Sequence, residues 1–415
     1  MRSGNNRTSL YCACLLALTS AASLAATPKL DLDRVTPVPA TEPVPTIDFF
    51  RPRVLSQPVL NPSGTCIAAV ITAGEDKHEL MVYSLADHKI ETVGGAGDKD
   101  VYNVHWLNDS RVIFGLSKLK LYGLGFLAAD VGDLSHAYPL LQYYGSSLVS
   151  IPLKNRLFPL VWNRHDFQTD KDLGVAEVNT NVKTGHFVDL NSTAVGNTWS
   201  AAMDVRDNNA KHITDTFSLP PSGIAYHYGA DKEGELAYCF TGDNGDLAMF
   251  RLADKQWVRC PVDLEQIDVE GAGNEPGQVV VIGPRQEGKP RALQLMDAAT
   301  GRLGEMVLQD KSYDFNGWLY RNPATGDVLG AVFERNGPRM FWFNDEYEAL
   351  QKILDGMFPG LVVHILGSDT KHNIFLVATF SQGNPSSTAG WTCRSASPAS
   401  SRIPRRGSTP PACRR

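Results

Sequence analysis

A pattern of short apolar segments separated by Gly-, Asp- and Asn-rich turns recurs along the chain from Val54 to Pro385. The repeat length of ~40–50 residues is typical of the blades of a β-propeller. Each blade is a four-stranded antiparallel sheet that cannot bury both faces alone, so blades stack around a common axis. The sequence therefore predicts an all-β fold over residues 47–385: a β-propeller of about seven blades of four antiparallel strands, the last one incomplete.

Turn and strand patterns within the repeats support this prediction. In the first repeat, Pro62 restricts φ and Gly64 accepts a positive φ, which favours a tight turn. The unbroken apolar run from Cys66 to Ile71 then predicts an inner strand covered on both faces. In the fourth repeat, Asn244-Gly245 favours a type I′ hairpin because both residues tolerate positive φ.

One short helix near residues 345–355 is expected to interrupt the strands. Asn344 or Asp345 can cap its first turn, where Glu346 is favourable, and Gly356 follows its end. Apolar residues recur at helical spacing on one face, namely Tyr347, Leu350, Ile353 and Leu354.

The N-terminus has the pattern of a secretory signal peptide over residues 1–25. Arg2 and Arg7 precede an apolar stretch from Leu10 to Leu24, which is too short to span a bilayer comfortably. The small residues that precede Ala26 predict cleavage between Ala25 and Ala26. A buried N-terminal helix is the alternative. Residues 26–46 form a Pro-rich linker, and the mature protein is expected to be periplasmic or extracellular, without stable membrane insertion.

Charge is distributed unevenly along the chain. Eight of its 39 Lys and Arg residues lie in the first 25 and the last 25 residues, which contain no Asp or Glu. The remainder therefore carries 31 basic against 45 acidic residues. An acidic body argues against nucleic acid as a main partner.

Five of the seven cysteines lie outside the signal segment. Cys66, Cys239 and Cys260 fall within predicted strands, at spacings that match no metal site. We expect them to be small buried apolar residues. A bridge between Cys239 and Cys260 is the alternative, since export permits disulfides.

Three segments resemble the N-terminal propeller of secreted prolyl-oligopeptidase-like serine peptidases (family S9). The first is Phe49-Phe50 followed by the turn at 60–64, and the second is Trp106 with Asp109-Ser110-Arg111. The most specific is the helix and Pro-Gly element at 344–360, which is similar to acylaminoacyl-peptidase-type members. The resemblance covers Ile47 to Pro385.

In that family the propeller precedes an α/β-hydrolase domain with a Ser-Asp-His triad, and it restricts which peptides reach the site. The nucleophile elbow of such a domain needs Gly-x-Ser-x-Gly because its serine occupies a crowded, strained turn. No such motif occurs in this chain; Gly115-Leu116-Ser117 and Gly145-Ser146-Ser147 come closest. We therefore assign no catalytic residue.

Other motifs have simpler explanations than a cofactor or metal site. His78-Glu79 lacks the second histidine of a zinc-peptidase helix, and Gly123 to Ala128 precedes no helix of a dinucleotide-binding unit. Asp243 to Asp246 lacks the spacing of a calcium loop. Phe341 to Phe343 fits strand core better than a ligand channel. No cofactor and no metal are expected.

After Pro385 the sequence becomes rich in Arg, Ser and Pro, without an apolar period. We expect residues 386–415 to be a disordered, out-of-frame tail that forms no blade strand; a basic tail that binds an anionic partner is the alternative. The overall hypothesis is the non-catalytic, substrate-gating propeller of an exported peptidase, with peptides entering its channel. The alternatives are a stand-alone periplasmic binding or scaffold propeller, and a propeller whose last blade stays open and aggregates.

Overall fold

The computed structural model describes residues 54–73, 76–95, 97–164, 172–183, 185, 198–334, 338–381, 384–393 and 413–414, and every structural statement below concerns these residues. Side chains are described up to residue 380, apart from residue 122 and residues 198–204. The predicted signal peptide with Ala25 and Ala26, the Pro-rich linker and most of the C-terminal segment lie outside this part of the chain.

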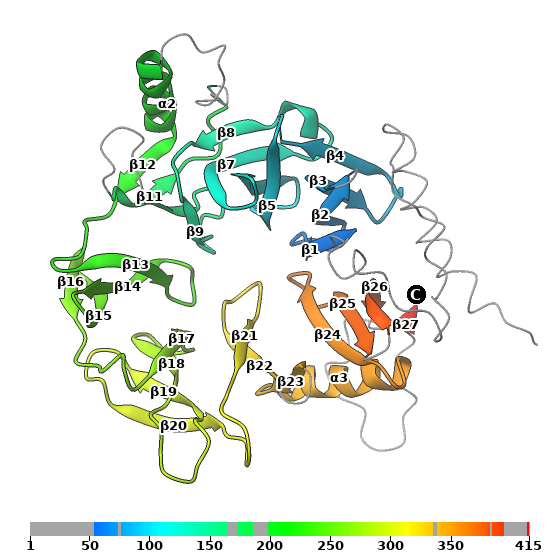
Figure 1. The fold of residues 1–415 in the computed structure, drawn as a ribbon. Helices are drawn as coiled ribbons and strands as arrows, with labels where there is room; N and C mark the ends of the chain where they lie inside the picture. Colours follow the sequence, from blue (N-terminus) through cyan, green and yellow to red (C-terminus); the bar gives the residue numbers. More distant parts are fainter. Residues whose placement is uncertain are drawn as a thin grey trace, which may run out of the picture.

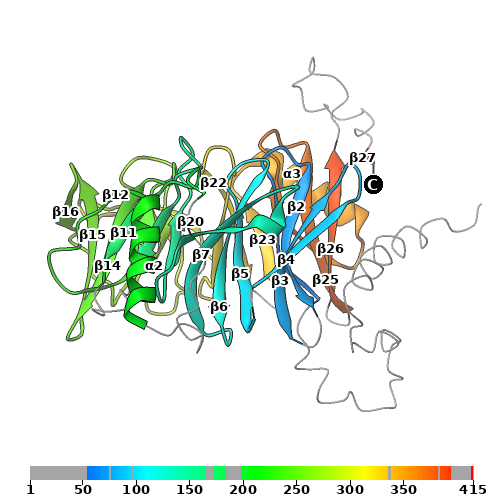
Figure 2. The same cartoon turned by 90° about the horizontal axis from the view of Figure 1, so that it is seen from above.

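The described strands form separate antiparallel sheets around a central axis, which is the arrangement of a β-propeller (Figure 1). Six sheets have four strands and one has three. Every sheet is built from consecutive strands, so no sheet takes a strand from a distant part of the chain. Seen from above, the sheets stand side by side with their strands crossing the thickness of the ring (Figure 2).

The first four sheets follow the chain in order, each beginning with its innermost strand. They consist of β1 (Leu55–Leu60), β2 (Cys66–Ala73), β3 (Lys77–Ser84) and β4 (Ile90–Gly94); β5 (Lys99–Trp106), β6 (Arg111–Lys118), β7 (Tyr122–Asp130) and β8 (Tyr138–Leu141); β9 (Ser147–Ser150), β10 (Leu160–Asn163), β11 (Gly174–Val178) and β12 (Ile213–Thr216); and β13 (Ile224–Ala230), β14 (Leu236–Asp243), β15 (Asp246–Ala253) and β16 (Gln256–Arg259).

The remaining three sheets complete the ring, and short helices lie between strands at three places. The sheets are β17 (Asp268–Ala272), β18 (Gln278–Ile282), β19 (Leu293–Asp297) and β20 (Leu303–Leu308); β21 (Gly317–Arg321), β22 (Val328–Glu334) and β23 (Pro338–Trp342); and β24 (Val362–Ser368), β25 (Ile374–Ser381), β26 (Asn384–Cys393) and β27 (Cys413–Arg414). The helices are η3 (Leu134–His136), α2 (Thr198–His212) and α3 (Asp345–Met357).

Apolar side chains are buried between neighbouring sheets. One cluster joins the first two sheets through Leu80 of β3 and Phe114 of β6, and another joins the third and fourth through Trp162 of β10 and Phe250 of β15. Complete burial of such a side chain contributes about 1.5–3 kcal/mol. The unbroken apolar runs in the second strand of each sheet thus reflect burial on both faces.

Helix α3 follows β23 at the place in the chain where the other sheets continue into a fourth strand. Asn344 caps it, because its Oδ1 accepts hydrogen bonds from the amides of Glu346 at 3.0 Å and Tyr347 at 3.1 Å. Tyr347 and Leu354 are buried against the sixth and seventh sheets, among Tyr320 and Val363. The predicted helix is therefore confirmed, and it covers the sheet that has three strands.

Two expectations from the sequence differ from the structure. The sheet with fewer strands is β21–β23, whereas the last sheet has four strands. Strand β26 continues past the expected propeller end at Pro385, because its backbone pairs with β25 through register pairs such as Val377 with Ala389. Backbone pairing needs no apolar side-chain period, so the composition of this segment was misleading.

Helix α2 was not predicted from the sequence. The sequence of α2 has no apolar stripe. It is held partly by polar contacts instead: the side chain of Asn209 accepts from the amide of Gln142 at 2.8 Å and donates to its carbonyl at 3.2 Å.

The expected hairpin and the expected cysteine burial are confirmed. Asn244 has φ 47° and Gly245 has φ 92°, and Asp243 pairs with Asp246 across the turn. The three cysteines whose side chains are described, Cys66, Cys239 and Cys260, are buried free thiols. No helix of the described residues is long and apolar enough to span a membrane.

Candidate functional site

The loops between the first and second strands of the sheets meet at one end of the ring, which we call the closed end. Hydrogen bonds between these loops connect the sheets around the axis and also join the last sheet to the first. They run from Ser63 N to Asp109 Oδ1 (2.7 Å), Arg156 Nε to Leu107 O (2.9 Å), Leu153 N to Glu233 O (2.8 Å), Val328 N to Asn274 Oδ1 (2.6 Å), and Thr370 N to Pro62 O (2.8 Å).

Two of these loops meet although their sheets are not consecutive. Lys232, after β13, forms an ion pair with Asp327, before β22, at 3.0 Å. Gly326 has φ +74°, and a Cβ atom there would lie 1.6 Å from the carbonyl oxygen of Lys232. Only glycine permits this approach, so the contact holds the loops of the fourth and sixth sheets against each other at the closed end.

A cavity of about 360 Å³ lies at the closed end, and residues of the first, second, third, sixth and last sheets line it. Eight of its twelve lining residues are apolar, including Trp106 and Leu153. The four polar ones are His105, Arg156, Ser368 and Thr370. A concave apolar site with few polar groups is the usual form of a binding site for a small ligand.

Arg156 is the one charged residue in the lining of this cavity. Its guanidinium donates through Nε to the carbonyl of Leu107 and through Nη2 to that of Trp106, both at 2.9 Å. Burial lowers the pKa of Arg156, but a guanidinium stays protonated in proteins. No carboxylate of the described residues forms an ion pair with it, so its charge faces the cavity without a counterion from the described chain.

His105 lies beside this cation. Burial and the nearby charge of Arg156 lower the pKa of His105 to about 4, so that its ring is neutral at pH 7. Its Nε2 lies 2.7 Å from Asn103 Oδ1. The cavity therefore holds one permanent positive charge and a neutral imidazole.

Ser368, Tyr347 and His372 form a second polar cluster, at the edge of the same cavity. The hydroxyls of Tyr347 and Ser368 lie 2.8 Å and 3.1 Å from the same nitrogen, His372 Nδ1. The neighbouring carboxylate of Asp369 does not complete a triad, because its Oδ1 accepts from the amides of Asn373 and Ile374. The cluster orders the turn between β24 and β25 and provides no nucleophile arrangement.

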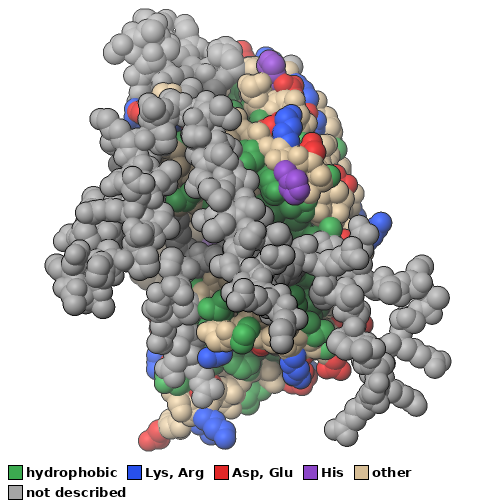
Figure 3. All heavy atoms as spheres, turned by 90° about the vertical axis from the view of Figure 1, so that its right-hand side faces the viewer, with side chains coloured by type: hydrophobic (Ala, Val, Ile, Leu, Met, Phe, Trp, Pro, Cys, Tyr) green, Lys and Arg blue, Asp and Glu red, His purple; other side chains and the backbone are tan. Residues whose placement is uncertain are grey.

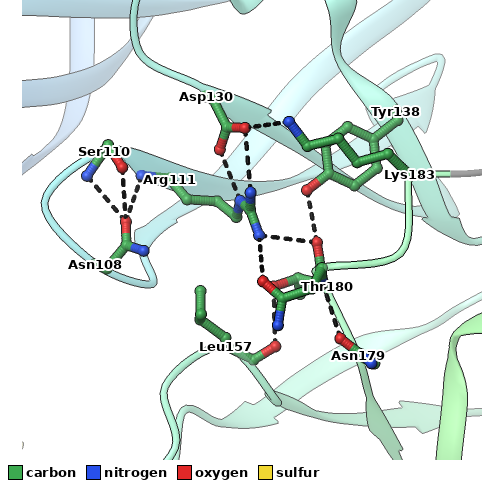
Figure 4. Close-up of polar contacts among 10 residues, drawn as sticks. Asn108, Ser110, Arg111, Asp130, Tyr138, Leu157, Asn179, Thr180 and Lys183 are labelled. Carbon is green, nitrogen blue, oxygen red and sulfur yellow. Dashed lines mark hydrogen bonds and ion pairs between the residues drawn. The ribbon is translucent and has the colours of Figure 1, made fainter.

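A separate network ties the second sheet to the third (Figure 4). Arg111 donates from Nε and Nη2 to the two carboxylate oxygens of Asp130, at 2.7 Å and 3.1 Å. Its Nη1 donates to Thr180 O and to Asn181 Oδ1, both at 3.0 Å, and Lys183 pairs with the same carboxylate. Arg111 thereby lowers the pKa of Asp130. Each of the three guanidinium nitrogens of Arg111 has an acceptor within the network, which indicates a structural role.

The opposite end of the ring, where the inner strands begin, differs in character; we call it the open end. In the fourth sheet, Ile224, Gly242 and Leu247 share one rung there, and Ile224 is 77% exposed. Large apolar side chains are exposed at the starts of inner strands and near the tips of hairpins: Val54, Leu119, Leu121, Leu247, Ile224, Tyr226 and Trp318. The most exposed of these side chains is Leu121, at 78%.

On the face seen from the right-hand side of Figure 1, positive and negative side chains do not form separate patches. In Figure 3, Lys and Arg side chains alternate with Asp and Glu over the coloured part of this face. In the described chain, no group of three or more His, Cys, Asp and Glu side chains lies close enough to hold a metal ion. The mixed charges on this face do not favour a polyanion, and the described side chains do not favour a metal ion.

The structure also locates the motifs weighed in the sequence. His78-Glu79 lies in β3, and Gly123 to Ala128 lies in β7, so both are strand segments. Trp342 packs on Tyr320 and Tyr347, which makes it part of the core rather than of a channel lining. Sequence reasoning missed His105, which lies in β5, and Arg156, which lies in the loop after β9, since nothing in the local pattern marks either residue as part of a site.

The fold defines this protein as a β-propeller with sheets of consecutive strands. Hydrogen-bonded loops and a cavity lie at one end of the ring, and exposed apolar side chains lie at the other. It is similar in structure to the propeller domain of the trilobed protease from Pyrococcus furiosus, with 11% identity, a TM-score of 0.48, and coverage of 81% of this chain and 94% of that one. The acylaminoacyl peptidase from Pyrococcus horikoshii has 10% identity and a TM-score of 0.45, with 81% and 51% coverage. Oligopeptidase B from Leishmania major has 11% identity and a TM-score of 0.46, with 81% and 47% coverage.

The chain thus spans about half the length of these two peptidases. No protein-family model and no curated protein matches it in sequence. The likeness concerns the arrangement of strands alone.

Proposed function

We propose that this chain is the non-catalytic, substrate-gating propeller of an exported serine peptidase of the prolyl oligopeptidase type. Its α/β-hydrolase partner domain is supplied from outside these 415 residues and packs on the open end. In this proposal the sheet β21–β23, with helix α3, is the seventh blade, and export follows cleavage between Ala25 and Ala26.

The observation that carries the proposal is the difference between the two ends. Single exposed apolar residues are normal on protein surfaces, but the open end gathers several of them. Val54, Leu119, Leu121 and Ile224 are between 63% and 78% exposed. An apolar surface of this kind indicates a protein contact. The closed end, in contrast, satisfies its polar groups through its own loops, for example between Pro62 and Thr370.

Gating follows from the same geometry. A hydrolase on the open end would receive substrates along the axis of the ring, whose other end is bounded by loops such as those that meet at Gly326 and Lys232. We expect this arrangement to admit short, unfolded peptides and to exclude folded proteins. The absence of Gly-x-Ser-x-Gly from the sequence supports the assignment of chemistry to the partner domain.

Activity of the isolated chain provides the first test. The protein beginning at Ala26 is purified and assayed with peptide and acyl-aminoacyl substrates and with a serine-directed fluorophosphonate. We expect neither turnover nor labelling. Hydrolysis that accompanies stoichiometric labelling would show that the propeller itself is catalytic and would overturn the proposal.

Docking provides the second test. Reading the DNA downstream of the coding segment in all three frames should reveal a hydrolase with Gly-x-Ser-x-Gly, which is then produced separately. Leu121→Asp and Ile224→Asp should weaken its binding to the propeller. Met306→Asp is the matched control, since Met306 is 49% exposed on the outer strand β20. Equal binding by all three variants would remove the open end as the docking surface.

A stand-alone periplasmic binding or scaffold propeller remains the second candidate, and the cavity at the closed end favours it. A stable monomer in size-exclusion chromatography that retains a co-purifying ligand, with no hydrolase encoded nearby, would support this alternative.

A further inference from the structure

The cavity at the closed end combines an apolar wall with a single cation. Its apolar residues come from distant parts of the chain, among them Val59, Trp106, Ile151 and Pro323. At about 360 Å³, it lies near the lower limit of cavities that hold small organic ligands, roughly 300–1,000 Å³. It is therefore suited to a compact ligand with an apolar body.

The charge of Arg156 has no counterion in the described chain. Its two recorded hydrogen bonds go to the neutral carbonyls of Trp106 and Leu107, and these leave its Nη1 without a partner among the described residues. A half-buried charge is costly when it is unpaired. An anion that enters the cavity would offset that cost.

The other polar groups of the cavity do not supply this anion. His105 is neutral and lies against Asn103. The hydroxyl of Thr370 donates to Pro62 O at 3.1 Å, and that of Ser368 lies against His372. Among the described polar groups of this cavity, the one without a counterion is thus the Arg156 guanidinium, which is a cation.

We propose that the cavity binds a carboxylate attached to a short apolar body, with Arg156 as the residue that recognises the carboxylate. Arginine suits this role because its planar fork matches the two oxygens of a carboxylate. Two sources share this chemistry: the C-terminus of a short peptide with an apolar last residue, and a medium-chain fatty acid.

This inference rests on the proposed gating function and adds a binding site to it, since a carboxylate site would hold the end of a peptide in the channel. It needs no hydrolase, however. Binding is measured on the isolated propeller, so failure of hydrolase docking and failure of this inference are distinguishable.

Isothermal titration calorimetry of the chain beginning at Ala26 tests the inference with three probes. These are N-acetyl-Leu-Leu with a free carboxylate, the same dipeptide as its C-terminal amide, and hexanoate. We expect the free acid to bind on the order of 10-fold or more tightly than the amide, and its affinity to fall with salt. Binding of hexanoate but not of the dipeptide would identify the fatty acid as the source.

Arg156→Gln should reduce the affinity for the free acid to that for the amide. Arg259→Gln is the matched control, because Arg259 is exposed on β16 and pairs with Asp246 away from the cavity. Arg156 also links two sheets, so Ala324→Trp, which fills the cavity without touching the charge, is a second variant and should also abolish binding. The inference is overturned if the acid and the amide bind equally, if no carboxylate binds, or if both cavity variants bind as the unaltered protein does.

Discussion

Lys232 Nζ lies 3.0 Å from Asp327 Oδ1, and this ion pair joins loops of the fourth and sixth sheets, which are not consecutive in the chain. The two loops can meet because Gly326 presents no side chain to the carbonyl of Lys232. The contact between the two loops therefore depends on a backbone approach more than on the partly exposed ion pair, since such pairs contribute little.

Gly326→Ala should destabilise the protein strongly. The left-handed backbone at φ +74° costs a residue with a Cβ about 1–2 kcal/mol, and overlap with Lys232 adds about 1–3 kcal/mol. Urea denaturation measures the change. Gly288→Ala is the control, because Gly288 has φ +70° with nothing within 4 Å, and it should incur only the backbone cost. Equal losses in the two variants would argue against a tight loop contact.

Arg111→Lys should lower the free energy of unfolding by about 1–3 kcal/mol, because lysine cannot reproduce hydrogen bonds to Asp130, Thr180 and Asn181 together. Arg259→Lys, at the exposed pair with Asp246, should change it by less than about 0.5 kcal/mol. Chemical denaturation of both variants at one salt concentration provides the comparison, and indistinguishable midpoints would contradict a structural role for the network between the second and third sheets.

His105 should make the protein less stable in acid. Its folded-state pKa of about 4 lies below the ordinary value of 6.5, so the unfolded chain binds the proton first. Stability is lost as the pH falls from about 6.5 towards 4, by up to about 3 kcal/mol. His105→Gln should flatten the dependence of the urea midpoint between pH 7 and pH 4.5, whereas the same change at exposed His88 should not. A parallel pH profile for His105→Gln would refute the assignment.

Cys239 should resist alkylation in the folded protein. Burial raises its pKa from 9.0 to about 12, and the thiolate is the reactive form. Iodoacetamide at pH 8, followed by peptide mass spectrometry, should leave Cys239 unmodified until denaturant is added. Because the thiol is neutral in the folded state, its contribution to stability is present below pH 9 and is lost as the pH rises from about 9 towards 12. Rapid modification without denaturant would show that the thiol is accessible.

The repeat pattern was sufficient to predict the propeller because each sheet is local in sequence. The hairpin at Asn244-Gly245 and the helix capped by Asn344 follow from residues within a few positions of each other. Helix α2 could not be predicted from its local sequence, because a polar residue, Asn209, holds it to Gln142, which lies 67 residues away in the sequence. Strand β26 was not predicted because its pairing with β25 involves backbone atoms, and amino-acid composition does not indicate backbone pairing.

The repeat of strands and turns could be predicted from the sequence, since it depends on neighbouring residues. The tertiary structure, in contrast, places Arg156 and Ser368 on one cavity and sets Lys232 against Gly326. Closure of the ring brings together loops that are hundreds of residues apart, as Pro62 and Thr370 are. No local pattern encodes such proximity, because it arises from the stacking of the sheets around their axis.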